Sequence, residues 1–414
     1  MRPWFAAGMG LLWAGVSIAA PLPRDAPAAH LGVQICANWT CHGAGEASPF
    51  AAVGQNEFHT WKNKDAHSDA YKALESDRGQ RIAERLGIQQ PTADGQCLVC
   101  HADYVSGARK GKRHRYSDGV GCEACHGGAA EWLGFHASGI NSHAENVAIG
   151  MYPTDDPEAR AKLCFSCHQG TTEHPMTHRL LGAGHPPLVI ELDAYTLARP
   201  AHHVEDEDYA RRKGIVEPLK VWAIGQIMAA QQWMDLHGGG QARPAGDWPE
   251  FSQYECYGCH RSTRGADGAG VGFPVLNTGQ LMMAAVVMDV LGSPSAGELR
   301  EAAAELRRGS PGAASRLRNL LSGALRTAKG ASLASSRAPD LVGTLRKRAE
   351  AGDFATYSAG LQATYAAAIA LDLQGLGDHA ALGGLYDRVN DGSRYNADDW
   401  LAQLRQLPGA VGGN

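Results

Sequence analysis

The sequence lacks the features of several common protein classes. After its first 20 residues, no apolar run is long enough to cross a membrane. No segment alternates apolar and polar residues over a sustained stretch, so few strands are expected. Basic residues do not outnumber acidic ones, because 38 Lys and Arg stand against 43 Asp and Glu. This balance of charge argues against nucleic-acid binding. Because few strands are expected, the sequence predicts a mainly α protein with much coil.

The ten cysteines form five close pairs, and a histidine directly follows the second cysteine of each pair. Four pairs have the spacing C-x-x-C-H, whereas ICANWTCHG at residues 35–43 has four residues between its cysteines. Histidine makes up only 18 of 414 residues, so five coincidences in five pairs exclude chance. The groups are Cys36/Cys41/His42, Cys97/Cys100/His101, Cys122/Cys125/His126, Cys164/Cys167/His168 and Cys256/Cys259/His260.

The C-x-x-C-H spacing is typical of covalent haem attachment. Each thiol adds to one vinyl group of the haem, and the adjacent histidine supplies the proximal imidazole to the iron. Three other roles of paired cysteines fit less well. A zinc site needs two cysteine pairs that converge on one ion and has no use for the adjacent histidine. A thioredoxin-like redox pair would occur once, and structural disulfides would not require the histidines. The sequence therefore predicts five covalently attached haem c groups, one of them on the stretched motif.

Composition divides the chain into three parts. Residues 1–20 carry one early arginine, an apolar run and small residues at the end, which is typical of a secretory signal. All ten cysteines lie in residues 21–275, a segment rich in Gly, Pro and His that is predicted to fold around its haems. Haem c is attached outside the bacterial cytoplasm, so a periplasmic protein is expected; an extracellular or membrane-anchored location is the alternative.

Residues 276–414 are predicted to form a small helical domain without a cofactor. Only one histidine, His379, lies there, and Ala, Leu, Arg and Gly dominate. Apolar residues recur every three or four residues in segments 279–292, 353–374 and 396–407, and this spacing predicts helices. Ser295, Ser310 and Asp353 are expected as N-caps. A further helix is predicted at residues 216–236, packed on haem or on this domain.

Thirteen histidines lie outside the five motifs, and five of them are needed if every iron has two imidazole ligands. The spacing of residues does not choose among these histidines. The candidates are His30, His59, His67, His114, His136, His143, His174, His178, His185, His202, His203, His237 and His379.

Roughly residues 32–262 resemble the multihaem family related to cytochrome c-554, the tetrahaem electron carrier paired with hydroxylamine oxidoreductase. Some members of this family also open with a stretched first motif. The resemblance rests on the segments WKNKDAHSDAYKAL, DGVGCEACHGGAAEWLGFH, CFSCHQGTTEHPMTHRLLGAGHPPLVIELDAY, RPAHH and WPEFSQYECYGCH.

The resemblance implies the five distal iron ligands. Carried over position by position, they fall on His67, His136, His178, His185 and His202. Three alternatives stay open at this point: His203 in place of His202, His174 in place of His178, and His59 as a competitor of His67.

The expected function is electron transfer through five closely packed, mostly bis-histidine haems, with redox proteins as donor and acceptor. A membrane-bound or oligomeric redox partner fits this function as well. Two alternatives remain: an enzyme in which one open haem acts on a small nitrogen or oxygen compound, and a subunit of a haem wire. The C-x-x-C-K motif of pentahaem nitrite reductase is absent, and no catalytic residue is predicted.

Overall fold

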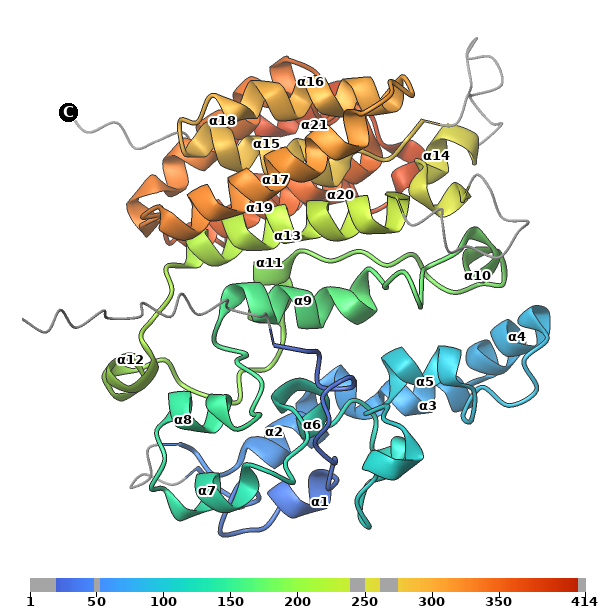
Figure 1. Cartoon of the computed structure of the whole chain (residues 1–414). Coiled ribbons are helices and arrows are strands. Elements are labelled where there is room, and N and C mark those ends of the chain that lie inside the picture. The colour runs from blue at the N-terminus through green and yellow to red at the C-terminus, as the bar shows by residue number, and fades with distance from the viewer. Residues whose placement is uncertain (1–19, 48–52, 239–249, 261–274, 409–414) are drawn as a thin grey trace, which may run out of the picture.

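The computed structural model describes residues 20–47, 53–238, 250–260 and 275–408, and these are largely helical (Figure 1). Within these ranges no strand forms, and β-pairing is limited to isolated bridges such as His30 with Lys110. The prediction of a mainly α fold with much coil is confirmed. The predicted signal segment, residues 1–20, lies outside the described residues except for Ala20.

The lower part of the molecule in Figure 1 consists of short helices joined by coil. One of its apolar clusters contains only three buried residues, Leu74, Leu98 and Ala102. So small a core cannot hold this many short helices together by itself. The helices are α1 (Val33–Cys36), α2 (Glu57–Lys64), α3 (Ala70–Glu75), α4 (Asp77–Leu86), α5 (Gly95–His101), α6 (Cys122–His126), α7 (Leu133–Ser138), α8 (His143–Ala148), α9 (Pro157–His168), α10 (His178–Gly182), α11 (Leu192–Ala198) and α12 (Glu207–Lys213).

The upper part is a helical bundle with a large apolar core. The helices predicted at residues 279–292, 353–374 and 396–407 are present. The short helix α14 (Cys256–Cys259) lies at one end of this bundle (Figure 1). The bundle helices are α15 (Gly279–Val290), α16 (Ser295–Arg307), α17 (Ala313–Gly330), α18 (Ala338–Glu350), α19 (Tyr357–Asp372), α20 (Ala380–Asp387) and α21 (Ala397–Leu404).

All three predicted N-caps in the bundle are wrong. Helix α16 begins at Ser295 itself, with Pro294 at its N-cap. Helix α17 begins at Ala313 with Gly312 at its N-cap, so Ser310 lies outside the helix. Asp353 also precedes its helix, α19, by several residues. Its carboxylate instead accepts a hydrogen bond of 2.7 Å from Nε of Arg300, because a half-buried guanidinium needs a charged partner.

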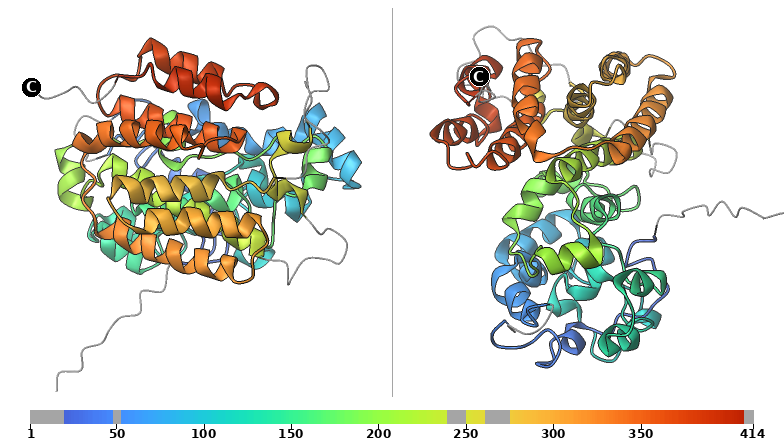
Figure 2. Two further views of the ribbon diagram at one scale, coloured as in Figure 1. Left: turned by 90° about the horizontal axis from the view of Figure 1, so that it is seen from above. Right: turned by 90° about the vertical axis from the view of Figure 1, so that its left-hand side faces the viewer.

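Helix α13 (Pro218–Gly238), predicted at residues 216–236, joins the two parts of the molecule (Figure 2). One set of its side chains, including Leu219, Trp222 and Ile227, is fully buried in the bundle core. Val221 and Ala229 instead pack in a second cluster with residues of α9 and α11. The helix therefore belongs to both packing units, although it precedes residue 276. The domain boundary predicted between residues 275 and 276 stays a prediction.

Among the described residues, no helix combines the length and apolar character needed to cross a membrane.

Candidate haem-binding sites

Each of the five motif histidines faces a second histidine from a distant part of the chain. The ring centroids of every pair are 6.0 to 6.3 Å apart. The pairs are numbered as sites 1 to 5 in the order of their motifs: His42 with His136, His101 with His185, His126 with His202, His168 with His67, and His260 with His178.

This separation matches two imidazoles bound to one metal ion. A metal–imidazole bond is about 2 Å long, and roughly another 1 Å separates the bound nitrogen from its ring centre. Two rings on opposite sides of one iron therefore place their centroids about 6 Å apart. The donor set thus fits a haem iron with both axial positions occupied.

Hydrogen bonds hold four of these imidazoles in a defined orientation. In each, Nδ1 lies within hydrogen-bond distance of a carboxylate or a backbone carbonyl, which leaves Nε2 for a metal. The sequence motifs did not reveal these hydrogen-bond partners. Asp65 does lie two residues before His67 in the segment WKNKDAHSDAYKAL. The bonds join His42 to Glu57 (2.9 Å), His67 to Asp65 (2.8 Å), His101 to the carbonyl of Ala70 (2.8 Å) and His185 to the carbonyl of Pro186 (2.8 Å).

Helix geometry explains why the standard motif presents its three groups together. In α5 the residues Cys97, Cys100 and His101 occupy positions i, i+3 and i+4, which lie on one face of a helix. Helices α6 and α9 end at their motif histidines in the same way. Three of the four standard motifs therefore direct both thiols and the imidazole to the same side.

The stretched motif of site 1 brings its groups together through a loop instead. Helix α1 ends at Cys36, and the chain turns at Asn38, whose carbonyl accepts a hydrogen bond of 2.8 Å from the N–H of Cys41. The N–H of His42 then donates to the carbonyl of Cys36 at 3.2 Å. This turn offsets the two extra residues and returns Cys41 and His42 to the end of α1.

Burial keeps several of these imidazoles neutral. Desolvation lowers the pKa of His126 to about 3, and it lowers the pKa of His168 and His202 to about 4. An imidazole must be neutral to bind a metal. Burial also raises the pKa of the Cys97 and Cys164 thiols to about 11, so these sulfurs are protonated as isolated thiols.

Sites 1 to 4 open into a single cavity of about 2350 Å³. A pocket for one small ligand usually measures about 300–1,000 Å³, so this space suits several large groups. Arg24, Arg160 and Arg199 line the cavity. The buried Nε of Arg160 has no hydrogen-bond partner, as expected if it pairs with a carboxylate of a bound group. The cavity and its cations therefore fit haem and its propionates.

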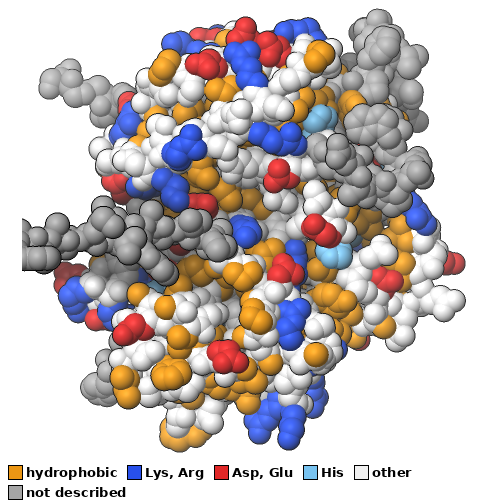
Figure 3. Space-filling view, viewed as in Figure 1, with side chains coloured by type: hydrophobic (Ala, Val, Ile, Leu, Met, Phe, Trp, Pro, Cys, Tyr) orange, Lys and Arg blue, Asp and Glu red, His pale blue; other side chains and the backbone are white. Residues whose placement is uncertain are grey.

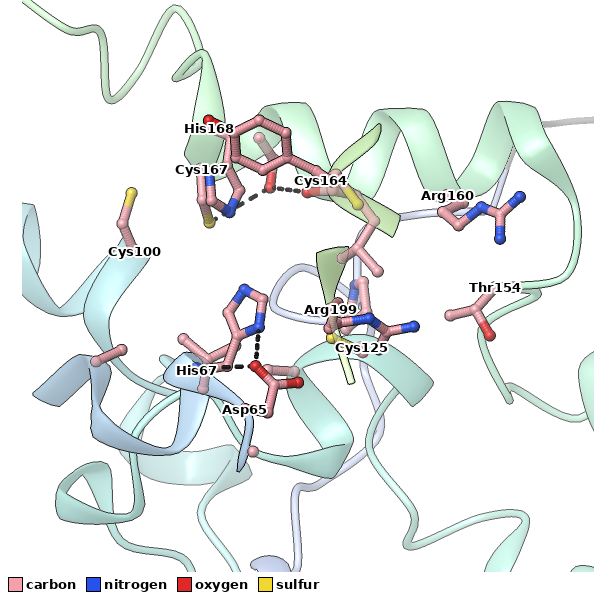
Figure 4. A pocket seen from close by; sticks show the side chains of 18 of the residues that line it. Asp65, His67, Cys100, Cys125, Thr154, Arg160, Cys164, Cys167, His168 and Arg199 are labelled. Atoms are coloured by element: carbon pink, nitrogen blue, oxygen red, sulfur yellow. Dashed lines mark hydrogen bonds and ion pairs between the residues drawn. The ribbon is translucent and has the colours of Figure 1, made fainter. Parts of the chain in front are cut away.

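Figure 4 shows the part of the cavity around site 4. The rings of His67 and His168 face each other across an open space, and Asp65 holds the ring of His67. Cys167 lies beside His168, and Arg160 and Arg199 lie farther along the same cavity.

Contacts between cysteines give the order of the sites. The thiols of Cys36 and Cys122 lie close enough for each to shift the pKa of the other, which places site 1 beside site 3. The thiols of Cys100 and Cys167 likewise shift the pKa of each other, which places site 2 beside site 4. Cys125 interacts electrostatically with Cys164, which connects sites 3 and 4. These contacts define a row of neighbouring sites in the order 1, 3, 4, 2.

Site 5 adjoins site 2 through α10. His178 of site 5 is the first residue of this helix, and His185 of site 2 follows the helix closely. Arg78 and Arg85 of α4 hold this segment through hydrogen bonds to the carbonyls of Gly184 and Ala183. The full order is therefore 1, 3, 4, 2, 5, with the motif helices of sites 1 and 5 toward opposite ends of the molecule (Figure 1).

The alternative distal histidines occupy other environments. His203 stacks on Tyr209 with ring centroids 5.4 Å apart, and His59 contacts the carbonyl of Gly43 at 3.2 Å. His174 is not paired with a motif histidine, whereas His178 is. His30 and His114 form a buried cluster around Asp103. The geometry thus favours His202, His178 and His67 over their competitors.

These features define the class of the protein, because five thiol pairs with adjacent and opposed imidazoles are the elements of a c-type cytochrome. A family model described as cytochrome c554 and c-prime matches residues 36–127, which contain the first three motifs. The match covers under half of the chain; over that segment it supports a relationship to the cytochrome c-554 family and a c-type cytochrome in electron transfer. No curated protein and no solved structure matches the chain.

Replacing the proximal ligand of the stretched motif tests whether site 1 holds a haem. We expect His42→Met to change the spectrum of one haem and to leave the others unaltered, because methionine sulfur replaces one imidazole. Resonance Raman and optical spectra of the purified variant measure the change. An unaltered spectrum with an unaltered haem count would show that site 1 holds no haem.

Proposed function

We propose that the protein is an exported cytochrome that carries electrons through five bis-histidine haem c groups. The observation that carries this proposal is the pairing of all five motif histidines with five other histidines at 6.0 to 6.3 Å. Bound haem c supplies reversible one-electron chemistry at its iron. The roles of the protein are attachment, axial ligation and spacing.

Occupation of both axial positions supports a carrier rather than an enzyme. A substrate needs an open position on the metal, and each of the five sites offers a second imidazole within reach. Ligation by two imidazoles also omits the methionine that raises the potential of small cytochromes c, so low potentials are expected. The partner histidines all belong to the same chain, which argues against a wire in which neighbouring subunits exchange ligands.

The contiguous row supports transfer along the length of the protein. Electron transfer falls steeply with distance, so a carrier needs neighbouring centres without gaps. The proximity of cysteines from adjacent sites, such as Cys36 to Cys122 and Cys100 to Cys167, indicates that these centres lie close together. Sites 1 and 5 then serve as the two ends, where redox proteins donate and accept electrons.

The proposed export rests on the sequence of residues 1–20, because haem c is attached outside the bacterial cytoplasm. The intact mass of the purified protein tests export and cofactor number together. We expect a chain shortened by the signal segment and enlarged by five haems. An unprocessed N-terminus or a smaller number of haems would contradict the corresponding part of the proposal.

Quantitative EPR of the ferric protein tests the ligation. Every haem should be low-spin, and any high-spin signal near one per chain would instead indicate an open, enzymatic site. The ring planes predict two kinds of low-spin signal. Perpendicular rings leave two iron d orbitals nearly equal in energy, which increases the anisotropy, whereas parallel rings separate these orbitals.

The five sites differ in this respect. The rings are nearly perpendicular at sites 2, 3 and 4, with interplanar angles of 82°, 90° and 89°. They are closer to parallel at sites 1 and 5, with angles of 9° and 25°. We therefore expect three highly anisotropic signals and two rhombic ones after correction for coupling between neighbouring irons.

A further inference from the structure

Three large apolar side chains are exposed beside the ligands of site 1. Trp39 is 76% exposed, Phe135 is 54% exposed and Ile140 is 84% exposed. Trp39 lies within the stretched loop between Cys36 and Cys41, whereas Phe135 and Ile140 flank the distal ligand His136. These three residues are called the site 1 patch below. Figure 3 shows hydrophobic side chains along the lower edge of the molecule, where Figure 1 places α7 and the loop after α1.

Bound haem does not account for this exposure. Other exposed apolar residues, such as Leu197 and Ile215, line the large cavity and would be covered when it is filled. None of the residues of the site 1 patch lines the cavity. Exposed aromatic and aliphatic side chains gathered at one place commonly mark a surface that binds another protein.

The charges around the patch indicate what kind of protein it binds. Segments 31–61 and 116–159, which supply the ligands and loops of site 1, contain no Lys or Arg. They contain nine acidic residues, of which Glu46, Glu131, Glu145 and Asp156 are exposed, whereas Lys62, Lys64, Arg115 and Arg160 border the two segments. An apolar centre with an acidic rim is complementary to a partner with an apolar centre and a basic rim.

We propose that the site 1 patch is the docking surface for a small, basic c-type cytochrome that exchanges electrons with site 1. The proposal rests on the proposed function, since site 1 stands at one end of the row of sites. The reaction moves one electron between two iron centres and neither forms nor breaks a bond. Interfaces of this kind are small, often below about 1,200 Å² of total buried area, so a few exposed side chains can dominate them.

The rate of electron exchange with a basic cytochrome c measures this docking. The full-length, haem-loaded protein is reduced, mixed in a stopped-flow instrument with ferric basic cytochrome c, and followed over a range of salt concentrations. We expect a second-order rate constant that decreases with added salt. The same cytochrome with succinylated lysines serves as the charge-inverted control, and it should react much more slowly.

Two sets of variants locate the surface. Trp39→Ser with Ile140→Asn removes the apolar centre, and Glu46→Lys with Glu131→Lys reverses the rim. Each set should lower the rate constant about tenfold, and the rim variant should also lose the salt dependence. Glu298→Lys, on α16 at the opposite end of the molecule, is the matched control and should leave the rate unchanged. Ile140→Asn alone tests the apolar centre if Trp39→Ser lowers the haem count.

The outcomes separate this proposal from the proposed function. Rates and salt dependence that both variant sets leave unaltered would overturn the docking surface, as would an equally fast reaction with the succinylated cytochrome. Reduction by dithionite and oxidation by a small inorganic complex should proceed fully in every variant. A wild-type protein that failed this chemical cycle would instead contradict its function as an electron carrier.

Discussion

Replacing His202 with alanine should convert one haem of the protein to a high-spin form that binds carbon monoxide. The ring centroid of His202 lies 6.3 Å from that of His126, the proposed proximal ligand of site 3. Burial lowers the pKa of both imidazoles, to about 4 and about 3 respectively, so both are available as neutral ligands. Removal of one leaves an open axial position. EPR and the absorbance change on adding carbon monoxide should each report about one-fifth of the haem.

The neighbouring histidine provides the matched control. His203 stacks on Tyr209 and is paired with no motif histidine, so His203→Ala should retain every low-spin haem and bind no carbon monoxide. The opposite pattern, with an open haem in His203→Ala and none in His202→Ala, would reverse the assignment of the ligand at site 3. His178→Ala and His174→Ala form an equivalent pair at site 5.

Ending the chain at residue 275 should abolish the soluble, folded protein. This truncation removes helices α15 to α21 and uncovers the face of α13 that is buried in the bundle core. Leu219, Trp222, Ile227 and Met234 are each 0% exposed in the full chain. Exposing each costs about 1.5–3 kcal/mol, and the sum is comparable to the whole stability of a typical domain, about 5–15 kcal/mol.

Further contacts between the parts would also be lost. The amide of Gln362 on α19 donates to the buried carbonyl of Ile190 at 3.1 Å, and Ser358 donates to Glu255 beside the fifth motif at 3.0 Å. Soluble yield, haem count and thermal unfolding of the truncated chain measure the effect. A chain ending at residue 408 keeps every described helix and is the control. A soluble 275-residue chain with five haems would establish the independent haem domain that composition predicted.

The helices of the bundle were predictable, whereas their ends and some partners were not. The periodicity of apolar residues locates α15, α19 and α21 because it reflects one local repeat. The N-cap predicted at Asp353 failed because a distant residue, Arg300, competes for the carboxylate. The packing of α13 against both parts of the molecule could not be predicted either. A helix that is apolar on most of its surface does not reveal which neighbour covers each face.

The cofactor class and the candidate proximal ligands could be predicted from the sequence alone. Two thiols and an imidazole lie within five to seven residues of chain in each motif, so local geometry is enough to present them together. The pairing of each distal histidine with its motif emerges only from the folded chain. These partners are separated by distances along the chain from 76 residues, His126 to His202, up to 101 residues, His67 to His168. Such pairs are set by the packing of whole segments, and no local spacing encodes that packing.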